Sequence, residues 1–237
     1  MDAIDIEPEF TESACAECGK TFCRPIFRFD GKEYLRISRC SRCTERHAEE
    51  IRCAEEEERR ARRVLQWNEA IPPLYRENDP NRLNPRAREV AERFDYQQDK
   101  GIFLHGDFRK GKTRCAFLIL RKAHDQGRSI MMMRSIDFAK HCATQFADNK
   151  DIQRDSQRLL DRCKSVGVLL LDDLGKEKIT ERVETTLFDV IDDRISRAKP
   201  MLITSNFDLN SLAKRMSSDQ GPAIIGRIIE FCHIVEL

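Results

Sequence analysis

The chain has 237 residues, which suits one domain with a small appendage or two modest domains. Hydrophobic residues make up 40%, enough for a globular core, and charged residues make up 35%, which implies a heavily solvated surface. A net charge of +1 gives no global attraction to nucleic acid or an anionic membrane. No apolar stretch approaches the roughly 20 residues of a membrane span, and the acidic start is unlike a secretory signal. We therefore expect a cytoplasmic protein with no membrane partner.

Four of the ten cysteines form two Cys-x-x-Cys pairs near the start of the chain. The four are Cys15, Cys18, Cys40 and Cys43. Each pair places two thiolates on one tight turn, and two such turns suit tetrahedral zinc, although the 21 residues between them lie just beyond the usual spacing. We predict a four-thiolate zinc site. Cys23 and His47 lie close by in the sequence and are less favoured substitutes.

The residues between the two cysteine pairs predict a hairpin. The signals are the alternation of Phe27 and Phe29, the turn pair Asp30-Gly31, and Tyr34-Leu35. Such a unit is too small to fold without its metal, so we interpret residues 1–47 as a zinc ribbon.

The predicted ribbon is locally basic. Between Lys20 and Arg46 there are eight Lys or Arg residues against three acids. Part of this charge can offset the four thiolates. The functional interpretation is that these basic residues contact nucleic acid or an acidic protein.

From Thr44 to about Asn68 the chain lacks Gly and Pro and predicts a long helix. An acidic run precedes a group of arginines, and acid four residues before base stabilises an exposed helix. We interpret residues 48–70 as a solvated helical linker. Three proline pairs then end the helix and lead into a second domain, residues 71–237. They are Pro72-Pro73, Asp79-Pro80 and Asn84-Pro85.

A phosphate-binding motif opens this second domain. The apolar run Ile102 to Leu104 predicts a strand, and it ends in Gly106-Asp-Phe-Arg-Lys-Gly-Lys-Thr113, which matches G-x-x-x-x-G-K-T before a helical segment. Glycines let backbone N–H groups point at phosphate oxygens beside the positive end of the helix. Lys112 would reach the outer phosphates, and the Thr113 hydroxyl would hold magnesium. The predicted ATP-binding residues in the loop are Gly106, Arg109, Lys110, Gly111, Lys112 and Thr113. A chance Gly-Lys-Thr turn is disfavoured by the strand before it and the helix after it.

After the loop, strands and helices alternate. We expect strands at 129–133, 166–171, 201–204 and 232–236, and helices at 115–126, 136–146, 152–163 and 180–198. Near-continuous apolar strands predict an α/β fold with a parallel sheet covered on both faces. Ligands bind such sheets at the carboxyl ends of the strands.

Three polar residues follow these strands. Asp172 ends an apolar strand and should help hold magnesium, Asp173 would orient the attacking water, and Asn206 could hydrogen-bond that water or the terminal phosphate. Taken alone, Asp172-Asp173 also fits two acids that cap a turn. Lys112 and Thr113 upstream favour nucleotide hydrolysis.

From about Ile71 to the end, the chain resembles the helicase-loader ATPases of the DnaC type and their relatives, the IstB transposition helpers, within the AAA+ superfamily. The motifs are Ile71-Pro-Pro-Leu-Tyr75, Leu104-His-Gly106 with Gly111-Lys-Thr113, Leu169-Leu-Leu-Asp-Asp-Leu-Gly175, Lys199-Pro-Met-Leu-Ile-Thr-Ser-Asn206 and Ile225-Gly-Arg227-Ile. The combination of Asp-Asp-Leu-Gly with Thr-Ser-Asn is fairly specific to this group, whereas a phosphate loop alone is not.

The resemblance implies a AAA+ P-loop ATPase that uses ATP, Mg²⁺ and, in its front module, Zn²⁺. Loaders carry an N-terminal zinc module that binds the replicative helicase, so the implied partners are a hexameric replicative helicase, single-stranded DNA and further copies of the AAA+ domain. Arg227 matches the family's arginine finger, supplied to the ATP of a neighbouring subunit. The expected function is helicase loading in DNA replication. An IstB-like transposition helper acting on target DNA is the alternative, although those usually have a helical front end. A zinc-dependent adaptor with a merely structural nucleotide site is disfavoured by the intact loop.

Three departures from the family pattern bear on turnover. Position 109 is Arg where relatives usually carry Gly, and Asp173 stands where AAA+ motors generally carry Glu. The sequence ends at Leu237, without the second-sensor arginine and helical lid that often follow. We therefore expect slow, partner-regulated ATP hydrolysis.

Overall fold

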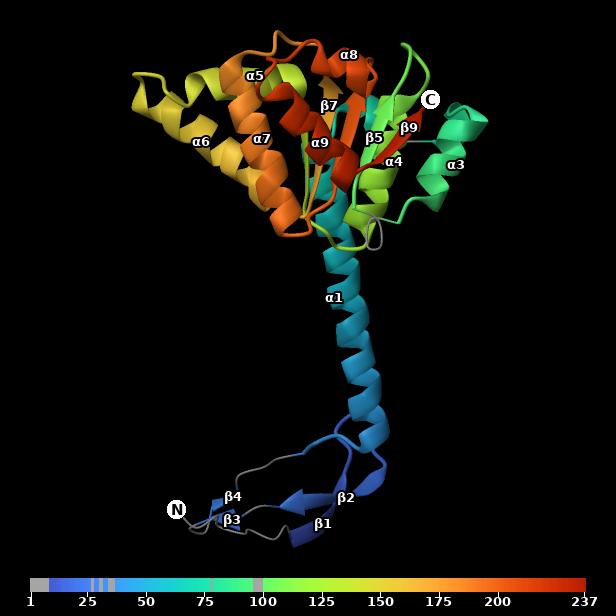
Figure 1. Ribbon diagram of the computed structural model, residues 1–237. Coiled ribbons are helices and arrows are strands. Elements are labelled where there is room, and N and C mark those ends of the chain that lie inside the picture. Colours follow the sequence, from blue (N-terminus) through green and yellow to red (C-terminus); the bar gives the residue numbers. More distant parts are fainter. Residues whose placement is uncertain (1–8, 27, 30–31, 34–36, 78, 96–99) are drawn as a thin grey trace. The chain divides into compact units, whose positions relative to one another are not determined.

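The computed structural model describes residues 9–26, 28–29, 32–33, 37–77, 79–95 and 100–237 (Figure 1). The chain divides into two compact units, Met1–Arg62 and Arg63–Leu237. The division falls within α1 (Ser41–Ala70), the long helix predicted from the sequence. In the part of the chain that is described, no helix has both the length and the apolar character needed to cross a membrane.

The first unit contains two short antiparallel strand pairs. β1 (Glu9–Ala14) pairs with β2 (Thr21–Ile26), and β3 (Arg28–Phe29) pairs with β4 (Lys32–Glu33). The β3–β4 pair is the hairpin expected between the cysteine pairs, while Phe27, the Asp30-Gly31 turn and Tyr34-Leu35 lie outside the described residues. β1 was not predicted, because Phe10 is its only large apolar residue and is itself 66% exposed.

The second unit is built on a five-stranded parallel sheet, as the sequence predicted. Its strands are β5 (Ile102–His105), β6 (Ile130–Arg134), β7 (Val168–Leu174), β8 (Met201–Ser205) and β9 (His233–Glu236). Their order across the sheet is β6-β7-β8-β5-β9. β8 thus lies between the strand that precedes the phosphate loop and the strand that carries Asp172.

Among the residues described after α1, three helical segments precede the sheet, and six helices connect its strands. They are α2 (Pro73–Arg76), the 3-10 turn η1 (Pro80–Arg82), α3 (Pro85–Arg93), α4 (Lys112–Asp125), α5 (Ser135–Thr144), α6 (Lys150–Ser165), α7 (Glu181–Ser196), α8 (Leu209–Ala213) and α9 (Gly221–Phe231). In each of the three proline pairs that end α1, the second residue starts a new helical segment, a position where the missing N–H of proline costs nothing.

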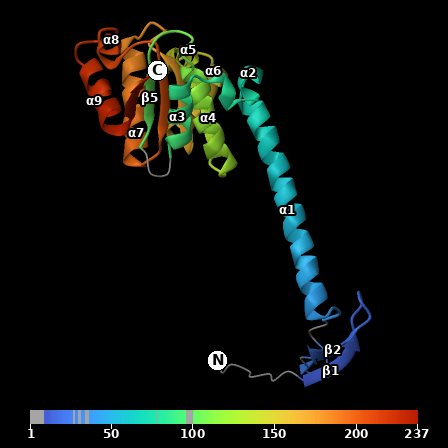
Figure 2. The same ribbon diagram turned by 90° about the vertical axis from the view of Figure 1, so that its right-hand side faces the viewer.

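Two apolar clusters cover the two faces of the sheet. Alternate residues of a strand point to opposite faces, so Phe103 and Leu171 pack with α5, α6, α7 and α9, while Ile102 and Leu170 pack with α3 and α4. Figure 2 shows α7 and α9 on one side of β5 and α3 and α4 on the other. Strands β5, β6, β7 and β8 are therefore largely buried, whereas the edge strand β9 is mostly exposed. The carboxyl edge of the sheet remains for a ligand.

Candidate nucleotide site and four-cysteine cluster

The phosphate loop joins β5 to α4. Gly106 has φ 132° and Gly111 has φ 95°, both in the region that favours glycine. A Cβ on Gly106 would lie 2.3 Å from the carbonyl oxygen of Leu237, which is closer than any real contact. Both glycines of the predicted motif are therefore required by the backbone.

Lys112 begins α4, and its side chain turns back into the loop. Its Nζ donates to the carbonyl oxygens of Gly106 (2.8 Å) and Asp107 (2.7 Å), and the residue is buried. Burial lowers the pKa of the Lys112 ammonium, and nearby carboxylates oppose that shift. The cation lies within the curve of the loop beside the positive end of α4, where a phosphate would meet it.

Asp172 links the phosphate loop to the sheet. Its Oδ1 accepts hydrogen bonds from the hydroxyls of Thr113 (2.9 Å) and Thr204 (2.7 Å). Burial raises the pKa of the Asp172 carboxyl, and the two hydroxyls lower it. The structure thus brings Thr113 and Asp172 together, as a shared magnesium site requires. Thr204 was not predicted, although it lies two residues before Asn206 in the same motif.

Asp173 follows in a strained conformation. Its φ is 62°, at an irregularity in the β7–β8 pairing. Its N–H donates to Thr204 Oγ1 (2.8 Å), and its carbonyl oxygen accepts from Ser135 Oγ (2.6 Å). The carboxylate lies 3.4 Å from Lys176 Nζ and is one-third exposed. The backbone is therefore fixed from two sides, while the carboxylate remains accessible to water.

The other two predicted catalytic residues lie differently. Asn206 directly follows β8 and is half-buried at the carboxyl edge of the sheet. Arg227 lies on α9, where its guanidinium pairs with Asp192 of α7 (2.9 Å) and with Glu230 (3.2 Å). Neither ion pair connects Arg227 to the phosphate loop of its own chain.

Arg109 and Lys110 complete the loop. Arg109 has φ 63°, a conformation that costs a residue with a Cβ about 1–2 kcal/mol. Glycine, the residue expected at this position from the family resemblance, would adopt this conformation without that cost. Lys110 contributes its carbonyl oxygen, which accepts from Asn84 Nδ2 at 2.7 Å. Asn84 was not predicted, because its contact joins segments 26 residues apart.

The four predicted cysteines meet in one cluster. Their Sγ atoms all lie within 4.8 Å of one another, and those of Cys18 and Cys40 are 3.8 Å apart. Tetrahedral zinc with bonds of about 2.3 Å would separate its sulfur ligands by about 3.8 Å, so the cluster fits zinc. Within the described residues, neither Cys23 nor His47 joins this group.

Hydrogen bonds and charges shape the cluster. Backbone N–H groups of Cys18 and Cys40 hold the pKa of Cys15 at about 6, whereas burial raises that of Cys43 to about 12. Glu17, in the first cysteine turn, pairs with Arg39 (3.3 Å) and with Arg46. Two of the eight basic residues of this segment are thereby neutralised within the unit.

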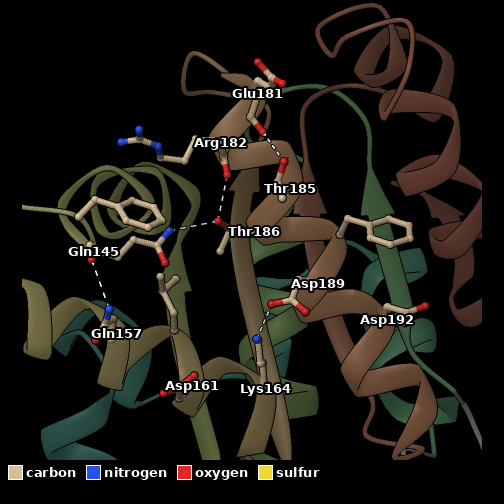
Figure 3. A pocket seen from close by; sticks show the side chains of 13 residues that line it. Gln145, Gln157, Asp161, Lys164, Glu181, Arg182, Thr185, Thr186, Asp189 and Asp192 are labelled. Carbon is tan, nitrogen blue, oxygen red and sulfur yellow. Dashed lines mark hydrogen bonds and ion pairs between the residues drawn. The ribbon is translucent and has the colours of Figure 1, made fainter.

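A separate hollow of about 970 Å³ lies between α5, α6 and α7 (Figure 3). Contacts cross it from the α5–α6 side to α7. Gln145 donates to Thr186 (3.3 Å), and Lys164 pairs with Asp189. The Arg182 guanidinium lies 4.9 Å from the centre of the Phe146 ring. None of its lining residues belongs to the phosphate loop, and these contacts attach α5 and α6 to α7.

Comparisons with known proteins agree with this geometry. The family model described as IstB-like ATP binding protein matches residues 83–237. The replicative helicase loader DnaI of Bacillus subtilis (strain 168) is 27% identical over 122 residues, which are 51% of this chain and 38% of DnaI. The chain thus spans well under half the length of this curated relative.

Two solved structures are similar in fold. The DnaC helicase loader superposes with a TM-score of 0.56 at 20% identity, covering 70% of this chain and 99% of that chain. The replication initiator DnaA bound to AMPPCP and single-stranded DNA gives a TM-score of 0.57 at 20% identity, covering 70% of this chain and 50% of that chain. At such identities the likeness concerns the fold of the second unit.

Proposed function

The chain belongs to the family of IstB-like ATP-binding proteins, and from that premise we propose that it hydrolyses ATP to load a replicative helicase onto single-stranded DNA. The observation that carries this proposal is the 27% identity with a replicative helicase loader. A four-cysteine cluster ahead of the nucleotide unit adds support, since the sequence resembles loaders in that respect also.

The hydrolytic step would rest on positioning and charge. Lys112 and the backbone N–H groups of the loop would bind the phosphates, and Thr113 with Asp172 would hold Mg²⁺. Bound magnesium would supply charge neutralisation at the phosphates. Asp173 has an accessible carboxylate at the same edge, so it would orient the attacking water, and Asn206 would hold that water or the terminal phosphate.

Arg227 would act on the nucleotide of a neighbouring subunit. Its pairs with Asp192 and Glu230 are partly exposed, and such pairs are worth about 0–1 kcal/mol. An arginine at the transferred phosphate can raise the rate by about 10³–10⁵. The surface pairs are therefore weak enough to be exchanged for the neighbour's phosphate, which makes assembly a condition for turnover.

The first unit would anchor the helicase. Its zinc centre, held by Cys15, Cys18, Cys40 and Cys43, would fix a small rigid surface, and the excess of basic residues between Lys20 and Arg46 would favour an acidic patch on the partner. Single-stranded DNA would be bound by assembled copies of the second unit, with a strong salt dependence.

The full chain should be titrated against a hexameric replicative helicase from its own source and against single-stranded DNA, each at low and high salt. We expect helicase binding that salt weakens modestly and that Cys40→Ser abolishes, and DNA binding that salt weakens steeply. A chain that ignores helicase would refute the loader assignment.

The alternative is a transposition helper of the IstB type, because the matching family is described as IstB-like. Such a protein should bind duplex target DNA and a transposase of its own source, and should not respond to helicase. The same titration with duplex DNA separates the two functions.

A further inference from the structure

The segment that leads into α3 lies against the phosphate loop. Asn84, the residue before α3, donates from Nδ2 to the carbonyl oxygen of Lys110 at 2.7 Å. The preceding residue, Leu83, is buried and lies close to Gly111. A Cβ added to Gly111 would lie 3.1 Å from Leu83 Cδ2. Two successive residues of this segment thus contact the last turn of the loop.

The Asn84 amide performs two tasks at once. Its Oδ1 accepts from the Ala87 N–H at 2.7 Å and caps α3, while its Nδ2 holds Lys110. A side-chain amide offers both an acceptor and a donor arm. Serine caps a helix about as well as asparagine does, but it has no second arm that extends to the loop. The two tasks can therefore be separated by substitution.

The bond to Lys110 determines how one peptide unit of the loop is turned. The Lys110–Gly111 peptide is trans, so its carbonyl and its N–H point in opposite directions. Holding the Lys110 carbonyl toward Asn84 leaves the Gly111 N–H pointing away from α3. Gly111 has no Cβ to resist a flip of this peptide, and its φ of 95° is one that glycine adopts freely. The external bond therefore supplies an orientation that the loop sequence does not.

We propose that Asn84 is a positioning residue of the nucleotide site, which keeps the Gly111 N–H turned toward the phosphates. This role rests on the proposed binding of nucleotide by the loop. Asn84 acts through the Lys110–Gly111 peptide and need not touch the ligand. The contact is solvent-exposed, so its loss should weaken binding about two- to fivefold, within the range of one neutral hydrogen bond.

The test is calorimetric titration of the full chain with ADP and Mg²⁺, together with the melting temperature of each variant. Asn84→Ser keeps the helix cap, so it should melt like the wild type and bind ADP two- to fivefold more weakly. Asn84→Ala should lose both the cap and the affinity.

Asn149 provides a matched control, because it caps α6 in the same way and has no contact with the loop among its hydrogen bonds in the described chain. Asn149→Ala should lower the melting temperature without changing ADP affinity. Wild-type affinity in Asn84→Ser would overturn the positioning role and leave the nucleotide site standing. A wild-type chain that binds no ADP would instead refute the site itself.

Discussion

The two units of this molecule are stabilised by different means. Up to Arg62, and leaving out residues 27–36, only Cys15, Ile26 and Cys43 are buried among the described residues, and two of these belong to the cysteine cluster. From Arg63 onward, two apolar clusters cover both faces of a five-stranded sheet. So small an apolar core contributes little, whereas a structural zinc ion contributes about 10–16 kcal/mol on binding. The first unit should depend on its metal and the second on packing.

The same contrast applies to the two sites. In the first unit, the four cysteines that would bind zinc include two of its buried residues, Cys15 and Cys43. In the second, Lys112 and Asp172 are held by hydrogen bonds within the protein, on a scaffold that packing maintains. Loss of a cysteine from the cluster should therefore unfold the first unit, whereas loss of Lys112 or Asp172 should leave the second unit folded.

The largest expected effect is that of Cys40→Ser on the first unit. The wild type should contain one zinc ion per chain, and the variant should lose it together with amide protection of β1 and β2. ADP affinity should stay unchanged, because the second unit has its own core. Metal analysis and hydrogen exchange on one sample measure both effects.

Cys23→Ser is the control for this substitution, and it should retain the metal because Cys23 is exposed and outside the cluster. Full zinc content in Cys40→Ser would mean that Cys23 or His47 replaces the missing ligand.

Lys112→Ala should abolish measurable ATP binding, a loss of about 100-fold or more, since it removes the charge that we propose contacts the phosphates directly. Zinc content and folding should be unaffected, in contrast to Cys40→Ser. Asp173→Ala should keep ATP affinity and stop hydrolysis, because it removes only the group that we propose orients the attacking water. Titration and phosphate release separate the two variants, and equal ATP affinity in Lys112→Ala and wild type would contradict the site.

Arg227→Ala should reduce hydrolysis strongly while leaving the protein folded. Mixing it with Lys112→Ala subunits should restore part of the rate, because each supplies the half-site that the other lacks. The measurement is ATP turnover across a series of mixing ratios. Absence of rescue at every ratio would favour a structural role for Arg227 in its pairs with Asp192 and Glu230.

The smallest effect concerns Arg109. Glycine would remove the left-handed strain of about 1–2 kcal/mol, and about 0.5–1 kcal/mol would return as lost conformational entropy. Arg109→Gly should therefore raise the melting temperature of the second unit by about 1–3 °C. Arg109→Ala retains a Cβ and should give no increase. An equal rise in melting temperature in both variants would mean that loss of the Arg109 charge, and not relief of backbone strain, causes the stabilisation.

How well a feature could be predicted from the sequence depends on how far apart in the chain the interacting residues lie. The glycines of the loop, Lys112 and Asp172 belong to short motifs that can be recognised from a few neighbouring residues. Helix α9 was missed because Gly221, Pro222 and Gly226 suggest a loop. Packing of Ile224 and Ile228 in the core outweighs those local preferences.

The residues that support the site were missed for a related reason. Thr204 contacts Asp172 across 32 positions of sequence, and Asn84 contacts Lys110 across 26 positions. Such pairings depend on strand order and helix packing, which single-sequence patterns do not specify. The assigned roles of Asp173, Asn206 and Arg227 stay predictions.

The hydroxyl of Thr204 determines which groups donate and which accept in the hydrogen bonds at the carboxyl edge of the sheet. A hydroxyl has one hydrogen, and the Asp173 N–H can only donate, so the Thr204 oxygen accepts there and its hydrogen is left for Asp172. Asp172 Oδ1 is then an acceptor for Thr204 and for Thr113 together. The arrangement accommodates the ionised carboxylate despite burial, and it leaves the second oxygen, Oδ2, for a cation or its water. A valine of the same shape at 204 would leave the Asp173 N–H without its acceptor and remove one of the donors that favour the charge.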